Sequence, residues 1–506
     1  AYVTAATEIL PEIREFERFS TAALNAYLQP EVAGYLDRLE RALAEGGFGG
    51  EFLIVQSNGG VMSAETARRR PVRTALSGPA AGVTAAAHIA AAAGFPDVIT
   101  GDIGGTSFDV SLIAGGEAAL SAQTAIDYGL VIRQPMIEIA TIGAGGGSIA
   151  WVDKGGLLRI GPESAGSTPG PVCYGRGGER PTVTDASVVL GRIDAENPIG
   201  GALERLDVGA AKAALDAHVG RRLGLDAVEA ADAVVRVANA RMAGAIRLVS
   251  IERGHDPRRF AFMPFGGGGG LHACALMQEA GVGRALVPRY PGVTSALGCV
   301  IADMRQDFVQ TLNTALDTLD GTALAEAIAA RHAEGMALLD KAGIAFEARE
   351  TAVSLDMAYA GQTHTVAAPL TVEITSQGVD PPSRKAVLSA FETAYRAQFG
   401  RLLDGTPVRV LNLHVAVTGR RPKFDLRTLA PDPEATLAGA RLGARPVYAA
   451  GNWHDTPLFD RLALPLGAEI RGPAILAQPD TTVFVAPGMT ARVDAFGNTL
   501  IEETGP

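Results

Sequence analysis

The sequence has 506 residues, of which 47% are apolar and 20% are charged, and it carries a formal net charge of -11. This length suffices for two or three domains, and the composition is that of a globular protein with enough apolar surface to fill its cores. The acidic balance excludes nucleic acid as the expected partner, because phosphate binding needs a basic face.

The sequence contains three cysteines, at Cys173, Cys274 and Cys299. They are too few and too far apart for a disulfide framework or a four-cysteine zinc site, so we expect a reducing, cytoplasmic location. The most apolar long stretch, 80–95, is too short to cross a bilayer, and no signal pattern opens the chain. No membrane partner is therefore expected. The short basic runs at 68–70 and 420–421 are interpreted as solvated surface.

The first hundred residues alternate between helical and strand-like patterns. Residues 21–47 predict a helix with a break near Pro30. Residues 52–55 predict a buried strand that runs into the polar turn 56–60 (Gln-Ser-Asn-Gly-Gly). Such a turn resembles a ligand-binding loop at the carboxyl edge of an open α/β sheet. The Ser-Gly-Pro sequence at 77–79 predicts the start of an alanine-rich helix.

The middle of the chain continues the alternation. Strands are predicted at 98–100, 108–113 and 260–262, and helices at 228–253 and from Leu271 onwards. The glycine-rich stretch 143–178 is too long for an idle connection, so we interpret it as a functional loop region.

The character of the sequence changes near Asp303. Helices are predicted at 322–341 and 385–399, a proline-rich and charged linker at 420–437, and strands and turns from 446 to the end. We therefore predict two domains: an α/β domain at 1–305, and a mixed α+β domain at 306–506 that ends in a β-rich tail.

The most specific motif is Gly-Asp-Ile-Gly-Gly-Thr-Ser-Phe-Asp-Val at 101–110, which lies between two strand-like runs and predicts a hairpin. Asp102 and Asp109 would repel a phosphate unless Mg²⁺ neutralised them, so we expect both to be catalytic and Asp102 to bind the metal. Backbone N–H groups and hydroxyls of the turn would hold phosphate oxygens: Gly104, Gly105, Thr106 and Ser107. The alternative is an ordinary β-hairpin.

A second glycine run, at 266–270, follows a predicted strand and opens a predicted helix. Five glycines cost folding entropy, which favours a backbone that approaches a flat or anionic ligand at the helix N-terminus. The predicted nucleotide contacts are Gly266, Gly267, Gly268 and Gly269. The alternative is a flexible interdomain hinge, and the spacing is not that of a Walker loop.

The third glycine run could form a wall that faces substrate or phosphate, together with a more distant aspartate: Gly145, Gly146, Gly147 and Asp185. Ordinary loop packing is the alternative. Cys173 lies in a Pro/Gly-rich loop and is a candidate nucleophile, although no base is evident beside it. His272 has a capping, packing or catalytic role, whereas His364 and His414 lie in strand-like runs without metal-site spacing.

The chain resembles the hydantoinase A/5-oxoprolinase family, which includes subunits of acetone- and acetophenone-type carboxylases. The motifs that carry this resemblance extend over nearly the whole chain: 15–18, 25–27, 56–60, 77–82, 102–109, 143–148, 161–166, 169–178, 184–186, 265–273, 359–362 and 472–475. Their number and order make a chance similarity improbable.

The resemblance implies an actin/sugar-kinase/Hsp70-like (ribonuclease H-like) ATPase core, in which two phosphate hairpins face each other. Residues 102–109 look like the second hairpin, and 266–270 look like the adenosine-contacting loop. No second Asp-x-Gly-Gly-Thr pattern exists in this sequence, and the chain opens on Ala1. We therefore expect that the native N-terminal region, with the first hairpin, is absent from this chain.

Three positions depart from the family pattern. Gly268 and Gly270 stand where the family more often has alanine and proline, which should loosen the loop more than it alters its contacts. Ala358 stands where a large basic residue is common, so a substrate role there is weakened.

The resemblance implies an ATP-dependent hydrolase subunit that opens a cyclic amide or imide such as 5-oxoproline, a hydantoin or a lactam. ATP and Mg²⁺ are the implied cofactors, a hydantoinase B-type subunit or domain is the implied partner, and a hetero-oligomer of dimers is the expected assembly. The alternatives are an ATP-dependent ketone carboxylase subunit, an ATP-driven conformational clamp and a small-molecule kinase.

Overall fold

The computed structural model describes residues 2–126, 129–201 and 203–505, so Ala1 lies outside the described residues. The chain divides into two compact units, each assembled from separate segments. Unit 1 comprises Ala1–Ala80, Leu120–Met136 and Ile301–Lys423, and unit 2 comprises Ala81–Ala119, Ile137–Val300 and Phe424–Pro506.

In unit 1, the described residues form a sheet with the strand order β1-β2-β13-β18-β14-β15. Its strands are β1 (Leu53–Val55), β2 (Val61–Ser63), β13 (Met304–Ala315), β18 (Val408–Arg420), β14 (Ala348–Tyr359) and β15 (Val366–Leu370). Along β18, buried residues largely alternate with less buried ones, because successive side chains point to opposite faces and one face lies on the core. Smaller pairings join β6 (Leu120–Ala125) to β7 (Val131–Ile137) and β16 (Ile374–Thr375) to β17 (Gly378–Val379).

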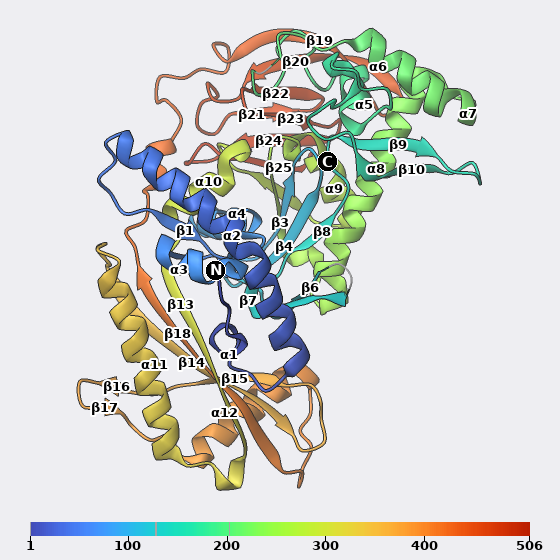
Figure 1. The fold of residues 1–506 in the computed structure, drawn as a ribbon. Helices are drawn as coiled ribbons and strands as arrows, with labels where there is room; N and C mark the ends of the chain where they lie inside the picture. The colour runs from blue at the N-terminus through green and yellow to red at the C-terminus, as the bar shows by residue number, and fades with distance from the viewer. Residues whose placement is uncertain (1, 127–128, 202, 506) are drawn as a thin grey trace. The chain divides into compact units, whose positions relative to one another are not determined.

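The helices of unit 1 are α1 (Ala6–Ile9), α2 (Glu15–Glu45), α3 (Ala64–Arg69), η1 (Pro71–Thr74), η8 (Leu316–Thr318), α11 (Gly321–Lys341) and α12 (Arg384–Phe399). The helix α11 packs on β18 and α12 packs on β15, and together they enclose the core of this unit (Figure 1). Asp320 begins α11, because its carboxylate accepts hydrogen bonds from the N–H groups of Thr322 and Ala323.

In unit 2, the described strands of the large sheet follow the order β21-β24-β25-β12-β11-β3-β4-β5, and β8 pairs with β4. Their bounds are β21 (Glu469–Arg471), β24 (Met489–Val493), β25 (Thr499–Glu503), β12 (Arg284–Val287), β11 (Ala261–Phe265), β3 (Val98–Ile103), β4 (Phe108–Ala114), β5 (Glu117–Ala118) and β8 (Ala140–Ile142). The strand β11 runs parallel to both β3 and β12, whereas β3 and β4 form an antiparallel hairpin. The carboxyl ends of β3 and β11 therefore meet at one edge of the sheet.

Two smaller sheets complete the strands of unit 2. They pair β9 (Ser148–Val152) with β10 (Leu158–Ser164), and order β19 (Arg441–Ala449), β20 (Asn452–Asp460), β22 (Ala474–Gln478) and β23 (Thr481–Val485). The stretch interpreted as a loop region, 143–178, thus contains a β-hairpin.

The helices of unit 2 include α8 and α9, which pack on strands of the large sheet, and α4 and α10, whose outermost residues belong to unit 1. They are α4 (Ser77–Ala92), α5 (Val183–Val189), α6 (Val208–Leu215), α7 (Arg221–Leu223), α8 (Ala227–Val249), α9 (Gly269–Ala280) and α10 (Thr294–Ile301). Single turns lie at η3 (Val172–Tyr174), η4 (Asp216–Gly220), η5 (Ile251–Arg253), η6 (Pro257–Arg259), η7 (Pro291–Val293) and η9 (Leu426–Leu429). The long helix α8 packs on α5 and α9 (Figure 1).

The two units divide the chain differently from the continuous domains, 1–305 and 306–506, that the sequence suggested. One change of unit falls at Ile301, near the expected boundary, but the tail from Phe424 belongs to unit 2. The reason is strand pairing, since β25 lies beside β12 in the large sheet. The expected linker, 420–437, contains a further point at which the chain passes from unit 1 to unit 2, between Lys423 and Phe424.

The helix predicted at 21–47 is longer than expected and has no break. It forms α2, which contains Pro30. Proline removes one backbone donor, and the freed carbonyl is that of Ala26, an exposed residue. Water can therefore satisfy that carbonyl, so the helix tolerates the proline.

Candidate functional site

The motif at 101–110 forms the β3–β4 hairpin of unit 2. Asp102 pairs in register with Asp109, and Ile103 with Phe108. Ile103 and Phe108 are buried, whereas the glycines and threonine of the turn are exposed. The hairpin therefore projects a small, backbone-rich tip from a rigid base.

Asp102 lies on a crowded strand end. Asp109 faces it on β4, and Phe265 faces it on β11. Burial, together with the negative charge of Asp109, raises the pKa of Asp102 to about 6. Two adjacent carboxylates in a partly desolvated place are unfavourable without a cation, so this edge of the sheet favours positive charge.

Asp109 is held by two hydroxyl groups. Thr141 Oγ1 donates to its Oδ1 at 2.6 Å, and Ser107 Oγ donates to its Oδ2 at 3.3 Å. The Ser107 hydroxyl, expected to hold a phosphate oxygen, is thus directed to the neighbouring carboxylate. Thr141 was not singled out in the sequence, because no local motif links it to a hairpin some 30 residues earlier.

The glycine run at 266–270 packs directly against the end of β3. Gly266 has a φ of 77°, and a Cβ at this position would lie 2.6 Å from the carbonyl oxygen of Ile103 and against Asp102 Oδ1. The N–H of Gly268 donates to the same Ile103 carbonyl at 3.0 Å. Only glycine allows both the backbone angle and this approach. The run connects β11 to α9 inside unit 2, so it is not a hinge between the units.

The glycine run at 145–147 packs on the tip of the hairpin. The N–H of Gly146 donates to the Gly104 carbonyl at 3.0 Å, and the N–H of Gly147 donates to the Gly105 carbonyl at 2.6 Å. A Cβ on Gly145 would lie 2.7 Å from the Gly104 oxygen. This run therefore holds the tip in place by backbone contacts.

Asp185 organises the loop beside this run. Its buried carboxylate accepts hydrogen bonds from the backbone N–H groups of Val172 (3.1 Å), Cys173 (2.7 Å) and Thr182 (2.8 Å). Thr182 Oγ1 also donates to it, at 2.8 Å, and completes a capping box at the start of α5. Asp185 thus fixes the position of the loop, and its carboxylate is occupied by these donors.

A cavity of about 230 Å³ in unit 2 opens between these elements. Part of its lining is glycine backbone, from the hairpin tip and from both other glycine runs: Gly104, Gly105, Gly146, Gly267 and Gly268. Apolar side chains also line it, among them Ile193, Pro198, Ile199, Leu203, Leu206 and Leu271. The cavity therefore combines polar backbone with apolar side chains.

His272 also lines this cavity and lies at the start of α9. Its Nδ1 lies 2.6 Å from Asn239 Oδ1, and burial, with the nearby charge of Arg192, lowers its pKa to about 4. The imidazole is therefore neutral at physiological pH, with Nδ1–H donating to the amide oxygen. Asn239 was missed in the sequence, since it is one polar residue on the buried face of α8.

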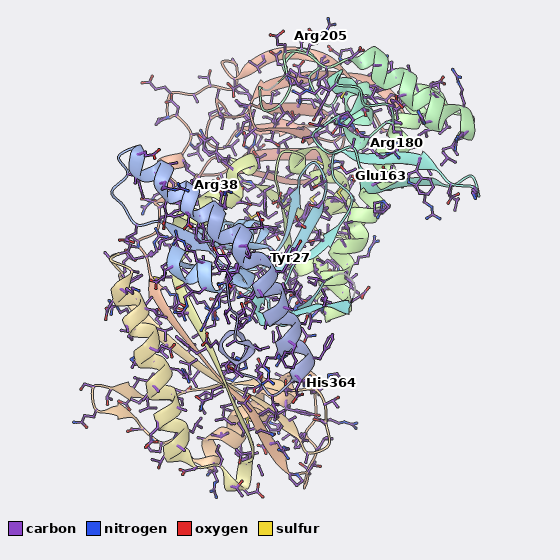
Figure 2. All side chains as sticks on the ribbon, in the orientation of Figure 1. Tyr27, Arg38, Glu163, Arg180, Arg205 and His364 are labelled. Carbon is purple, nitrogen blue, oxygen red and sulfur yellow. The ribbon has the colours of Figure 1, made fainter. Side chains whose placement is uncertain are left out.

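The remaining candidates lie elsewhere. Burial raises the pKa of the Cys173 thiol far above its usual range, which argues against a nucleophilic thiolate. His414 contacts Asp356 in unit 1 at 2.8 Å. His364 is exposed (Figure 2). Glu163 and Arg180 form an ion pair on the surface of unit 2.

The described residues contain no cluster of three or more histidine, cysteine, aspartate or glutamate side chains placed to hold a metal ion. Over the same ranges, every helix is either too short or too polar to cross a bilayer.

The chain belongs to the hydantoinase/oxoprolinase family. Residues 18–308 match the family described as Hydantoinase/oxoprolinase, and residues 312–502 match the Hydantoinase/oxoprolinase C-terminal domain.

Two relatives and one solved structure illustrate this membership. The chain is 36% identical over 97% of its length to the caprolactamase subunit alpha of Pseudomonas jessenii, of which it covers 70%. It is 31% identical over its whole length to the acetophenone carboxylase gamma subunit of Aromatoleum aromaticum, of which it covers 69%. The crystal structure of the ATP-dependent caprolactamase from Pseudomonas jessenii superimposes with a TM-score of 0.84 at 35% identity, covering 99% of this chain and 72% of that one.

Proposed function

We propose that the chain is a subunit of an ATP-dependent hydrolase that opens a cyclic amide or imide, such as 5-oxoproline, a hydantoin or a lactam. The observation that carries this proposal is the pairing of Asp102 with Asp109 at the tip of a hairpin whose glycines open into a cavity. The similarity to the ATP-dependent caprolactamase from Pseudomonas jessenii supports ATP as the nucleotide.

The lining of the cavity suits a nucleotide. Its apolar side chains match the faces of an adenine ring, and its glycine backbone matches phosphate oxygens. The N-terminus of α9, which begins at Gly269 without a side-chain cap, adds a positive helix end. These features support an ATPase core of the actin/sugar-kinase/Hsp70 type.

Mg²⁺ fits the same edge of the sheet. Burial and the negative charge of Asp109 raise the pKa of Asp102, and a cation beside the two carboxylates would offset both effects. Mg²⁺ is usually held by one or two carboxylates together with phosphate oxygens and water, which is the donor set that this edge offers to a bound nucleotide. The metal would supply charge neutralisation, and Asp102 would orient its coordination.

ATP is needed because resonance stabilises an unstrained amide and makes it resistant to hydrolysis. Transfer of the γ-phosphoryl group to the amide oxygen breaks that resonance and creates a leaving group, with ADP released. Water then adds at the carbonyl carbon and the ring C–N bond breaks, so that the protonated nitrogen leaves as the amine and an acyl phosphate remains. A second water hydrolyses the acyl phosphate to the carboxylate and inorganic phosphate. The chain's contribution is to hold the phosphates at Gly104 and Gly105 and to exclude water from the apolar wall.

A hydantoinase B-type subunit is the proposed partner, since the relatives named above are described as subunits. A second candidate function is ATP-dependent carboxylation of a ketone, which the similarity to an acetophenone carboxylase subunit favours. Both functions use the same nucleotide site and differ in the acceptor of the phosphoryl group.

The test is ATP turnover by the chain assembled with its partner, screened over 5-oxoproline, hydantoins, lactams, and ketones with bicarbonate. Turnover with a cyclic amide is expected, and turnover only with ketone plus bicarbonate would select the second function. Asp102→Asn should lower kcat by roughly a hundredfold or more, because it removes charge at the metal edge. Asp256→Asn, an exposed aspartate of the same unit, is the matched control. Full coupled activity of Asp102→Asn would overturn the assignment of the hairpin.

A further inference from the structure

A second cavity, of about 250 Å³, lies entirely within unit 1. It is lined by the polar turn at 56–58, by the start of the chain near α1, and by parts of β7, β13 and α11. Five arginines line it: Arg69, Arg70, Arg73, Arg133 and Arg331. Three acidic residues share the lining, Glu8, Asp307 and Glu334, so cations outnumber anions.

Two of these arginines have carboxylate partners. Arg133 Nε donates to Glu12 Oε2 at 2.5 Å, and Arg331 Nη1 donates to Glu334 Oε2 at 2.7 Å. Their charges are therefore largely compensated within the protein.

Of the three remaining arginines, Arg69 is exposed, whereas Arg70 and Arg73 are half-buried. Within the described ranges, neither Arg70 nor Arg73 forms an ion pair with a carboxylate. Arg73 donates from Nη2 to the backbone oxygen of Asp307 at 3.0 Å, but the Asp307 carboxylate is taken by Arg305 (Nη2 to Oδ1, 2.8 Å) and Asn58 (Nδ2 to Oδ2, 2.5 Å). The nearest acidic group is thus already satisfied.

The positive charges of Arg70 and Arg73 also repel each other. Burial, together with the charge of Arg70, lowers the pKa of Arg73 to about 10, against the weaker attraction of Asp307 and Glu334. Burial likewise lowers the pKa of Arg70, with Arg69 adding to the effect. Like charges held in a desolvated place are costly unless an anion joins them.

The backbone that carries Arg73 is fixed in advance by the polar turn. Ser57 donates to the Arg73 carbonyl oxygen from its N–H at 2.7 Å and from its Oγ at 2.8 Å. Gln134 Nε2 donates to the Val72 carbonyl at 3.0 Å. The turn singled out in the sequence as a ligand-binding loop therefore acts by positioning an arginine, and the basic run at 68–70 is not wholly solvated surface, since Arg70 lines the cavity.

We propose that Arg70 and Arg73 bind a small oxyanion, a carboxylate or a phosphate group, in this cavity. Guanidinium groups match the geometry of both anions through paired N–H donors, and the cavity volume admits a small metabolite that carries such a group. The proposal does not rest on the nucleotide site, because its residues all belong to unit 1.

The test is calorimetric titration of the chain with inorganic phosphate and, separately, with acetate. At least one of them should bind to the unmodified chain, and Arg70→Gln should weaken that binding by about tenfold or more. Arg73→Lys, which keeps the charge but loses the paired donors, should weaken it as well and guards against misfolding of the first variant. Circular dichroism of each variant establishes that it is folded.

Two controls separate this cavity from other anion sites. Arg68→Gln removes a neighbouring arginine, in α3, but Arg68 pairs with Asp37 and Glu40 outside the cavity, so binding should be unchanged. Asp102→Asn should also leave binding unchanged, whatever it does to nucleotide turnover. Preference for phosphate or for acetate identifies the group that the cavity accepts. Absence of binding by both probes, or equal binding by the folded Arg70→Gln variant, would overturn the proposal.

Discussion

Asp102 and Asp109 face each other across the β3–β4 hairpin, and only Asp109 has hydroxyl donors, from Ser107 and Thr141. Burial, together with the negative charge of Asp109, raises the pKa of Asp102 to about 6. The hairpin thus places one hydrogen-bonded carboxylate beside one whose ionisation is opposed by burial.

Asp102→Asn is expected to stabilise the nucleotide-free protein at neutral pH. Because the folded pKa of Asp102 lies above its unfolded value, ionisation penalises the folded state, and stability is lost as pH rises from about 4 to about 6. The variant should therefore match the wild type near pH 4 and exceed its free energy of unfolding by about 1–3 kcal/mol near pH 7. Urea denaturation across this pH range measures the difference, and a difference independent of pH would contradict the burial argument.

Gly266→Ala is expected to destabilise unit 2 and to abolish nucleotide binding. The substitution would combine a φ of 77° with a Cβ pressed against the Ile103 carbonyl and Asp102, so a loss of about 2–4 kcal/mol is expected. Gly244→Ala is the control, since Gly244 lies in α8 with no heavy atom within 4 Å of the added Cβ. That variant should gain about 0.5–1 kcal/mol. Thermal denaturation with and without ATP measures both effects, and a neutral Gly266→Ala would show that the loop rearranges freely.

Arg461 is expected to be essential for joining the C-terminal strands to the large sheet. Its buried guanidinium donates to the carbonyls of residues 287–289, to Gln478 Oε1 at 2.6 Å and to Thr499 Oγ1 at 3.0 Å. Arg461→Met leaves these acceptors without donors and should cost about 3–5 kcal/mol. Arg492→Met, at an exposed position of β24, should change stability by no more than about 0.5 kcal/mol. Equal melting temperatures of the two variants would contradict this role.

The His414–Asp356 pair is expected to make unit 1 more stable below neutral pH than above it. Burial opposes the charge on His414, but the hydrogen bond to Asp356, together with the charges of Asp356 and Glu12, outweighs burial and raises the pKa of His414. Its stabilisation is therefore complete below about pH 6.5 and is lost as pH rises through the folded value, whereas the lowered pKa of Asp356 keeps that carboxylate ionised.

His414→Gln should accordingly cost about 1–2 kcal/mol near pH 5.5 and less near pH 8.5. His364→Gln, at an exposed position, serves as the reference and should show no such dependence. Guanidinium denaturation at the two pH values gives the comparison. A larger cost at the alkaline value would reverse the sign of the argument.

The hairpin and the glycine runs could be read from the sequence because each depends on residues that are adjacent in the chain. Glycines next to a strand end predict a close backbone approach, and the structure places Gly266 against Asp102. The apolar wall of the cavity could not be read in the same way. Five of its residues lie in irregular structure without a helical or strand period, so nothing local marks them: Ile193, Pro198, Ile199, Leu203 and Leu206.

The roles of other residues could not be predicted from the sequence, because they depend on partners that are distant in the chain. Asp185 was expected to face a ligand, but its carboxylate is occupied by N–H groups of Val172, Cys173 and Thr182. The arginine cavity of unit 1 was not predicted, since it requires residues from α3, β7, β13 and α11 together. Motif spacing cannot supply such contacts.

The pairing of β25 with β12 sets an order of events during protein synthesis. Unit 1 has all its segments once Lys423 has left the ribosome, whereas the sheet of unit 2 lacks an internal strand until Glu503 emerges. The nascent chain must therefore keep β12 unpaired on one side from the synthesis of Val287 until β25 is made. A stop codon just before Thr499 would leave that edge permanently open to other polypeptides.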